Sequence, residues 1–179
     1  MAVYKLFPYK DSTVYSFYPK MNTGIDSIIE VFNLNLAIDS YPQVSRFLTE
    51  FVQSEIVDVV DNKIAGSEWD VNLRAFIATA QGIVESTDLS VHPVAQYWWN
   101  GTGTYLDSPK TEDGVCWDSP QFSGSVAWSS SGTDSTNHYV TSSRDATYAV
   151  AGGGAWYLSG SDGTLYAVTQ SFDTRSDKD

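Results

Sequence analysis

The sequence predicts an all-β fold, namely an antiparallel two-sheet β-sandwich with jelly-roll-like topology and one short helix. Tyr, Trp, Phe, Thr, Val and Ser are abundant, and short apolar stretches alternate with clusters of Gly, Asp, Asn and Ser, a pattern typical of strands joined by turns. Neither an internal repeat nor a linker divides the 179 residues. A chain of this length buries a sizeable core as one unit, so we expect residues 1–179 to form a single β-sandwich domain.

The first half of the chain opens with three predicted strands and one predicted helix. The strands are Thr13–Tyr18, Ser27–Phe32 and Val44–Val52, each rich in β-branched and aromatic residues. Between Ser54 and Ile64 the apolar residues recur at helical spacing instead, and Ser54 is a suitable N-cap. We expect a short helix there, lying across an end of the sandwich.

The segment Trp69–Ala80 has the clearest strand pattern in the chain. Polar and apolar residues alternate, so that Val71, Leu73, Ala75 and Ile77 fall on one face of an extended chain. This alternation predicts a strand.

The second half alternates between predicted strands and turn-rich loops. Leu89–Trp99 is expected to be extended, and Pro93 within it indicates an edge strand or a bulge. Asn100–Asp118 and Ser129–Thr136 are expected to be loops, the second of them exposed and mobile. The predicted late strands are Ala146–Val150, Trp156–Ser159 and Gly163–Phe172.

The charge of the chain excludes several partners. The 22 Asp and Glu residues outnumber 10 Lys and Arg, and this acidic balance repels phosphate, so no nucleic-acid partner is expected. No apolar run approaches the roughly 18 residues of a membrane helix, so no membrane partner is expected. The N-terminus lacks a basic start followed by an apolar run, so no signal peptide is predicted and synthesis in a host cytoplasm is expected.

No catalytic residue, metal site or cofactor is predicted. Cys116 is the only cysteine, and as a nucleophile it would need His92 or His138 as a base. Nothing in the sequence brings either histidine near it, and we interpret Cys116 as a small apolar residue beside Trp117. The motifs of serine hydrolases, zinc proteases and phosphate-binding loops are missing from the sequence.

An acidic loop offers a candidate calcium site, which we weigh against a simpler interpretation. The candidate ligands are Asp107, Glu112, Asp113 and Asp118. Calcium takes six to eight oxygens in a defined order, and these spacings match no standard calcium loop. We therefore interpret the four residues as a solvated acidic turn.

The 6 tryptophans suggest a carbohydrate platform, because sugars stack on exposed indole rings. Trp98 and Trp99 cannot both face inward in one alternating strand, which makes Trp99 the better candidate. Trp128 is the second candidate, beside the predicted loop at residues 129–136. The alternative is that these aromatic side chains fill the core of the sandwich.

Several segments, taken in order, resemble the DNRLRE (disaggregatase-related) β-sandwich family. Lys10–Ser16 followed by Asn22–Asp26 resembles the strand and turn with which that family opens, and Ser45–Phe51 resembles its next segment. Further similar segments are Leu73–Phe76, Val94–Trp98, Gly101–Gly103, Asp107–Pro109 and Gly114–Trp117. The form of this pattern, down to Gly153–Tyr157, is similar to that of virion structural proteins of T4-like phages of marine cyanobacteria.

The chain departs from the family pattern at two places. Leu48–Phe51 lacks the usual basic residue ahead of the Phe, which puts in doubt a charge pair that the resemblance implies. The family pattern also continues into closing strands, whereas Gln170–Phe172 is followed only by Asp173–Asp179. Either the closing strands are supplied differently or, as we favour, these residues are the N-terminal part of a longer protein.

The resemblance implies a non-enzymatic structural or accessory protein of a phage virion. It would assemble on the neck, tail or capsid with other virion proteins and with copies of itself. The alternative is a carbohydrate-binding module that attaches the particle to host surface glycans, with Trp99 and Trp128 and the loops at residues 100–118 and 129–136 as the contact. A polysaccharide-cleaving enzyme is a third class, but it requires an acid or base that the sequence does not reveal.

Overall fold

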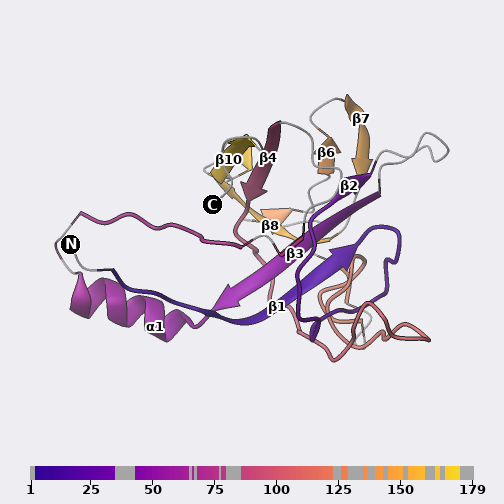
Figure 1. Cartoon of the computed structure of the whole chain (residues 1–179), viewed down its shortest axis with the longest axis horizontal. Coiled ribbons are helices and arrows are strands. Elements are labelled where there is room, and N and C mark those ends of the chain that lie inside the picture. Colours follow the sequence, from indigo (N-terminus) through magenta and orange to yellow (C-terminus); the bar gives the residue numbers. More distant parts are fainter. Residues whose placement is uncertain are drawn as a thin grey trace.

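The structure is a computed structural model, and it describes residues 3–34, 43–64, 66, 68–76, 78–79, 86–122, 126–128, 135–136, 140–142, 145–150, 153–159, 164–165 and 168–173. Most regular elements in this part of the chain are strands, and they pair into small antiparallel sheets (Figure 1). The coarser part of the predicted fold class, an antiparallel β-rich fold with one short helix, is therefore confirmed.

The longest strands lie side by side in one sheet of order β1-β3-β2. β1 (Pro8–Tyr15) pairs antiparallel with β3 (Gln43–Phe51), and the short β2 (Asn33–Leu34) pairs with the other edge of β3. β3 confirms the predicted strand Val44–Val52. β1 begins earlier than the predicted Thr13–Tyr18 and ends at Tyr15, because the chain turns at that point.

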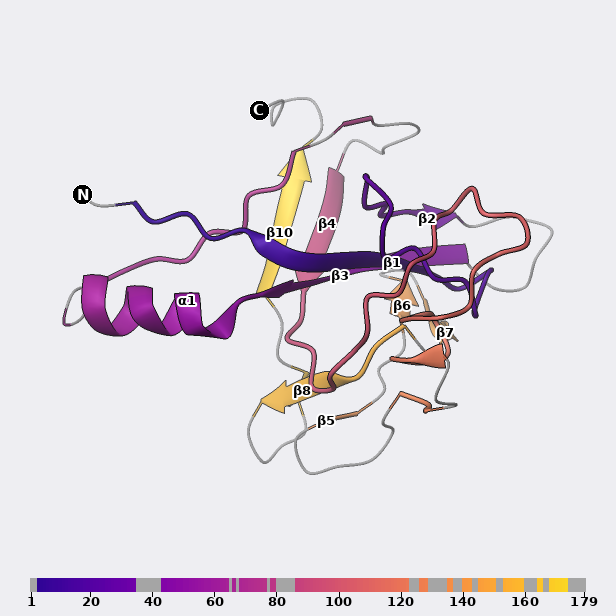
Figure 2. The same cartoon turned by 90° about the horizontal axis from the view of Figure 1, so that it is seen from below.

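The remaining strands form three smaller sheets (Figure 2). They are β4 (Ser86–Val91) with β10 (Val168–Asp173), β6 (Val140–Ser142) with β7 (Asp145–Val150), and β8 (Trp156–Ser159) between β5 (Ser135–Thr136) and β9 (Thr164–Leu165). The predicted late strands are confirmed, the last of them in two pieces. β4 ends at Val91, ahead of Pro93, which carries no N–H for a ladder. The predicted loop Ser129–Thr136 is wrong at residues 135–136, which form β5, and its other residues lie outside the described residues.

The predicted helix exists, but it starts and lies differently from the prediction. α1 (Gln53–Asp58) continues into a π-helical turn, η1 (Val59–Lys63). Val52 occupies the N-cap and no side chain caps the helix, so the predicted N-cap role of Ser54 is wrong. Neither element has a buried residue, and α1 projects away from the sheets together with residues 3–7 instead of covering an end of them (Figures 1 and 2). No helix in the described part of the chain is long and apolar enough to cross a membrane.

The predicted strand Ser27–Phe32 is wrong, because side chains take over the hydrogen bonds that a ladder needs. The N–H of Glu30 donates to Oγ1 of Thr13 at 3.0 Å, and the N–H of Phe32 donates to Oγ of Ser45 at 2.9 Å. The segment thus follows β1 and β3 while bonding to their hydroxyl groups. The first backbone–backbone hydrogen bond to β3 forms directly ahead of β2, where the N–H of Ser45 donates to the carbonyl oxygen of Phe32 at 3.0 Å.

The predicted strand Trp69–Ala80 is also wrong. Residues 68–76, which we call the extended segment, run as a long trace that pairs with no described strand (Figure 1). Every one of these residues is exposed to solvent. The alternation of the sequence is therefore that of a strand, but the strand has no partner within the described part of the chain.

The core lies between β1, β3 and the chain that follows β4. Its buried side chains are Val14, Val44, Leu48, Trp98, Val115, Trp117, Trp128 and Ala155. The guanidinium of Arg46 also enters this region and lies 4.8 Å from the centroid of the Trp117 ring. Burial lowers the pKa of Arg46 to about 10, so the group stays cationic at neutral pH.

Candidate functional site

One buried side chain, Asn22, organises the long loop of the second half of the chain. Its Nδ2 donates to the carbonyl oxygens of Asn100 at 2.7 Å and Val115 at 2.9 Å. Its Oδ1 accepts from the N–H groups of Gly24 at 3.1 Å and Gly103 at 2.8 Å. We call these five residues the Asn22 cluster. A buried amide whose donors and acceptor are all paired fixes the surrounding backbone in one arrangement.

Glycine is required next to Asn22 because the backbone approaches the amide so closely. Gly101 has a φ of 80°, and a Cβ there would collide with Oδ1 of Asn22. At Gly114 a Cβ would meet Nδ2 of Asn22 at 2.5 Å. The role of Asn22 as a structural centre was not predicted, since its carbonyl partners lie 78 and 93 positions away. The sequence marked Asn22 only as the start of a turn that resembles a family pattern, and the loop only by its abundance of glycine.

An exposed pair of aromatic side chains lies directly ahead of the loop that the Asn22 cluster orders. Trp98 is buried whereas Trp99 is 51 % exposed, which confirms that the two indoles do not both face inward. Two hydrogen bonds fix the backbone of Trp99, because its N–H donates to the carbonyl oxygen of Pro120 and its carbonyl oxygen accepts from the N–H of Val115. Tyr97 is 63 % exposed and meets Trp99 edge to face, with the ring centroids 5.9 Å apart. We call Tyr97 and Trp99 the aromatic pair.

Lys10 packs against Tyr97, one member of this pair. Its ammonium lies 4.2 Å from the centroid of the Tyr97 ring and 4.3 Å from that of Trp98, and it donates to the Trp98 carbonyl at 2.7 Å. Lys10 also forms an ion pair of 2.7 Å with Glu50, which lies directly opposite it in the β1–β3 register. The cation that pairs with Glu50 is therefore Lys10 on the neighbouring strand, and no basic residue stands just ahead of Phe51.

The hydrogen bonds around Glu50 shift two pKa values in opposite directions. Partial burial works against ionisation of Glu50, but hydrogen bonds from Lys10 and Tyr9 outweigh it and lower the pKa of the carboxyl group. The hydrogen bond to Glu50, 2.5 Å long, raises the pKa of Tyr9 to about 12. Both groups therefore hold one protonation state across neutral pH, and they serve as fixed supports of the surface.

Trp128, the second predicted member of a carbohydrate platform, does not lie on the surface. Its side chain is only 3 % exposed, and its Nε1 donates to the carbonyl oxygen of Cys116 at 3.2 Å. The prediction that Trp99 and Trp128 form one exposed platform is therefore wrong. Indole rings fill the core at this position, as the alternative interpretation has it.

The acidic residues of the loop accept hydrogen bonds within their own turns. The carboxylate of Asp107 accepts from the N–H and hydroxyl of Thr104 and from the hydroxyl of Thr111 at 2.9, 2.7 and 2.5 Å. These bonds, that of Thr111 foremost, lower the pKa of Asp107 to about 2. Asp113 accepts in the same way from the N–H and hydroxyl of Thr102. Among the described residues, no group of three or more His, Cys, Asp or Glu side chains is placed to hold a metal ion.

Cys116 is a buried thiol, which agrees with its interpretation as a small apolar residue. Burial raises the pKa of Cys116 to about 11, so the thiolate is scarce at neutral pH and the group is poorly suited to nucleophilic attack. Of the two candidate bases, His138 lies outside the described residues.

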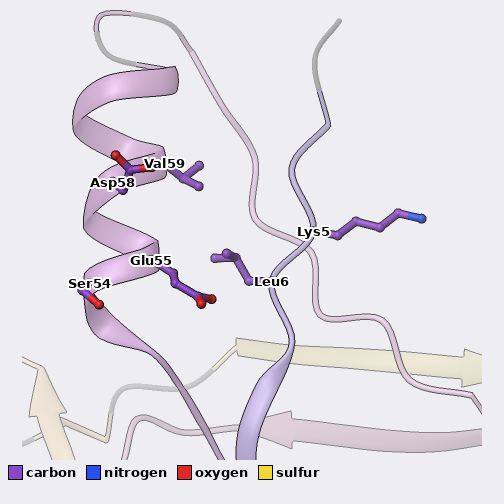
Figure 3. Close-up of a pocket in the computed structure, with 6 residues that line it drawn as sticks. All are labelled: Lys5, Leu6, Ser54, Glu55, Asp58 and Val59. Atoms are coloured by element: carbon purple, nitrogen blue, oxygen red, sulfur yellow. The ribbon is translucent and has the colours of Figure 1, made fainter.

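A second surface lies on the side of the molecule where α1 projects. An open hollow there is lined by Lys5, Leu6, Ser54, Glu55, Asp58 and Val59 (Figure 3). Leu6 points toward the helix, while the ammonium of Lys5 points away from it. Large apolar side chains are exposed in each of the three segments that run on this side: Val3 and Phe7 in residues 3–7, Ile56 and Val57 in α1, and Trp69, Val71, Leu73 and Phe76 in the extended segment. The hollow has no converging set of acid, base and nucleophile.

Comparison of the chain with protein-family models, with curated proteins and with solved structures finds no match. Function is therefore inferred from two surfaces of the molecule itself, the aromatic pair and the exposed apolar side that carries the extended segment.

Proposed function

We propose that this protein is a non-enzymatic structural subunit of a phage virion, which assembles on the neck, tail or capsid with other virion proteins and copies of itself. The fold that we propose for it is an antiparallel two-sheet sandwich with jelly-roll-like topology. The observation that carries the proposal is the exposed apolar side, on which Val71 is 80 % and Phe76 is 86 % exposed.

Exposed apolar side chains of this kind support assembly. Scattered apolar residues are ordinary on protein surfaces, but a group of them on one side of a molecule is typical of an interaction site. The extended segment, α1 and residues 3–7 share the projecting side of this protein (Figures 1 and 2). A subunit that buries these groups against its neighbours gains stability on assembly.

The virion as the place of assembly is supported by the resemblance of the sequence to phage structural proteins. The direct test is to purify particles of the phage that encodes this chain, quantify their proteins by mass spectrometry, and trace the chain by cryo-electron microscopy. A fixed copy number per particle and density at symmetric positions would support the proposal. Particles that lack the chain would overturn it.

A second candidate function, attachment to surface glycans, is favoured by the aromatic pair. Tyr97 and Trp99 present two rings on a rigid base formed by Lys10 and the ordered loop. Rings held in this way lose little conformational freedom when a sugar stacks on them.

The glycan hypothesis can be tested by titrating host surface polysaccharide against the wild-type chain and two tryptophan variants. Trp99→Ala removes a member of the pair, whereas Trp69→Ala removes an equally exposed indole elsewhere, since both are 51 % exposed. Binding that is lost only in Trp99→Ala supports the hypothesis. Absence of binding by the wild type, or equal loss in both variants, contradicts it.

A further inference from the structure

The extended segment has two chemically different faces. Residues of odd number, including Trp69, Val71 and Leu73, are apolar, while the even face carries the opposite charges of Asp70 and Arg74 and ends at the apolar Phe76. Every side chain on both faces is exposed. This is the alternation of a half-buried strand in a stretch of chain that buries neither face.

The backbone of the extended segment is open as well. Within the described part of the chain, no hydrogen bond joins residues 68–76 to any other residue. Unpaired N–H and C=O groups along an apolar, alternating stretch form a template on which another strand pairs readily. As far as the described residues reach, both edges of the segment are therefore open to an incoming strand.

The sequence of the segment is complementary to itself in the antiparallel direction. If two copies meet with Asn72 opposite Asn72, then Asp70 of each copy lies opposite Arg74 of the other, and Val71 lies opposite Leu73. Cross-strand pairs of opposite charge, and apolar pairs, are the units that stabilise a sheet. Neither Asp70 nor Arg74 forms an ion pair with a described residue, so no described residue competes with a second copy for these charges.

We propose that the extended segments of two copies of this chain pair antiparallel about a two-fold axis at Asn72, forming a β-ribbon at the centre of a dimer contact. The two-fold axis makes each cross-strand pair occur twice, as in an isologous interface. A two-stranded ribbon alone is only marginally stable. Residues 3–7 and α1 project on the same side as the extended segment, and their exposed side chains Phe7, Ile56 and Val57 add apolar surface for the contact.

The inference names a partner for the proposed assembly function and rests on it. A second copy fits better than an unrelated strand because one arrangement satisfies both charge pairs and both apolar pairs at once. Moving the axis by one residue, to Val71, would also form charge and apolar pairs, Glu68 with Arg74 and Trp69 with Leu73, but it would leave Asp70 opposite an uncharged Asn72 and residues 75 and 76 without a partner in the segment. The axis at Asn72 also pairs all nine residues of the segment, so we assign that register.

A charge-swap series tests the pairing by analytical ultracentrifugation of the full chain. Arg74→Glu places two carboxylates opposite each other and Asp70→Arg places two cations opposite each other. Each change should raise the dimer Kd by about tenfold or more, since two pairs are broken at once. The double variant Asp70→Arg/Arg74→Glu restores opposite charges and should restore the wild-type Kd. A monomeric wild type, or a dimer that neither single change weakens, overturns the proposal.

Disulfide trapping tests the register. Directly opposite residues of an antiparallel ribbon have Cα atoms about 4.5–5.5 Å apart, within the range that a disulfide spans. Asn72→Cys should therefore cross-link two copies under mild oxidation, while Phe76→Cys should not, because it lies far from its own counterpart. The native Cys116 is buried and leaves the background low. Cross-linking through Val71→Cys in place of Asn72→Cys would overturn the assigned register.

Mass spectrometry of purified particles separates failure of this inference from failure of the proposed function. A wild-type chain that is present in particles but monomeric in solution, and whose Asn72→Cys variant does not cross-link in particles, overturns the ribbon and leaves the virion role standing. A chain that dimerises as described but is missing from particles overturns the virion role while supporting the ribbon.

Discussion

The Asn22 cluster and the extended segment contrast in how sequence pattern relates to structure. Residues 100–119 have the composition of a loop and almost no regular structure, yet many of them are buried and joined by hydrogen bonds. The extended segment has the composition of a strand, yet it is exposed along its whole length. Order in this protein thus follows the presence of bonding partners more closely than it follows local propensity.

The difference has a physical origin. Alternation of apolar and polar residues gives a strand two faces, but it does not place a second strand beside it. A buried amide such as Asn22 binds any backbone groups that the fold brings to it, whatever the secondary structure of those groups. Predictions from one sequence therefore detect the capacity to pair, while the partner itself depends on the tertiary fold or on another molecule.

The largest expected effect is that of Asn22→Ala. This change removes four hydrogen bonds and leaves buried backbone groups unpaired, so we expect a loss of about 3–5 kcal/mol in the free energy of unfolding. Asn62→Ala is the matched control, since its amide bonds an exposed Asp58 and its loss should cost less than about 0.5 kcal/mol. Urea denaturation followed by tryptophan fluorescence measures both. Similar losses for the two variants would show that the cluster does not organise the loop.

Gly101→Ala separates crowding from backbone strain. Gly101 and Gly66 have similar φ values, 80° and 73°, but only Gly101 lies against Asn22, whereas a Cβ at Gly66 meets nothing within 4 Å. We expect Gly66→Ala to cost about 1 kcal/mol from the left-handed backbone alone. Gly101→Ala should cost about 2–4 kcal/mol, because the new methyl group also displaces the amide. Equal losses in thermal denaturation would mean that the loop yields easily around Asn22.

Acid titration should reveal the contribution of Asp107 to the order of the loop. Its folded pKa, about 2, lies below the ordinary value of 3.8, so its stabilising effect is fully present above the ordinary value and is lost as the pH falls toward 2. The difference in unfolding free energy between the wild type and Asp107→Asn should therefore be constant from neutral pH down to about pH 5 and shrink below it. A difference that grows on acidification would contradict the assigned hydrogen bonds.

The smallest expected effect lies in the extended segment. At concentrations where the chain is monomeric, Phe76→Ser should change the free energy of unfolding by less than about 0.5 kcal/mol, because the side chain is already exposed. Leu48→Ala, in the core, should cost about 2–5 kcal/mol under the same conditions. Chemical denaturation at several protein concentrations tests this contrast. A large loss for Phe76→Ser in the monomer would mean that the segment packs within its own chain.

Local pattern was sufficient for elements whose partners take part in ordinary ladders. β3 and the late strands follow their predicted ranges, because alternation and a neighbouring strand act together there. Local pattern failed for Ser27–Phe32, where hydroxyl groups instead of carbonyl oxygens accept the backbone hydrogen bonds. It also failed for the extended segment, which has no partner strand among the described residues. At the candidate site, the opposite orientations of Trp98 and Trp99 followed from alternation. The burial of Trp128 did not, since it depends on contacts with Cys116 that no spacing encodes.

The hydrogen bond from Asn22 to Val115 cannot form until late in the synthesis of the chain, because the two residues are 93 positions apart. At ordinary translation rates, roughly 5–20 s pass between the synthesis of one residue and that of the other. β3 follows β1 after a shorter delay, so both strands of this pair are synthesised while the partners of Asn22 are still missing. Closure of such a long loop is slow and comes late. For these seconds the buried amide of Asn22 has no carbonyl to bind, so the arrangement that it fixes in the finished protein is reached only after the second half of the chain has been made.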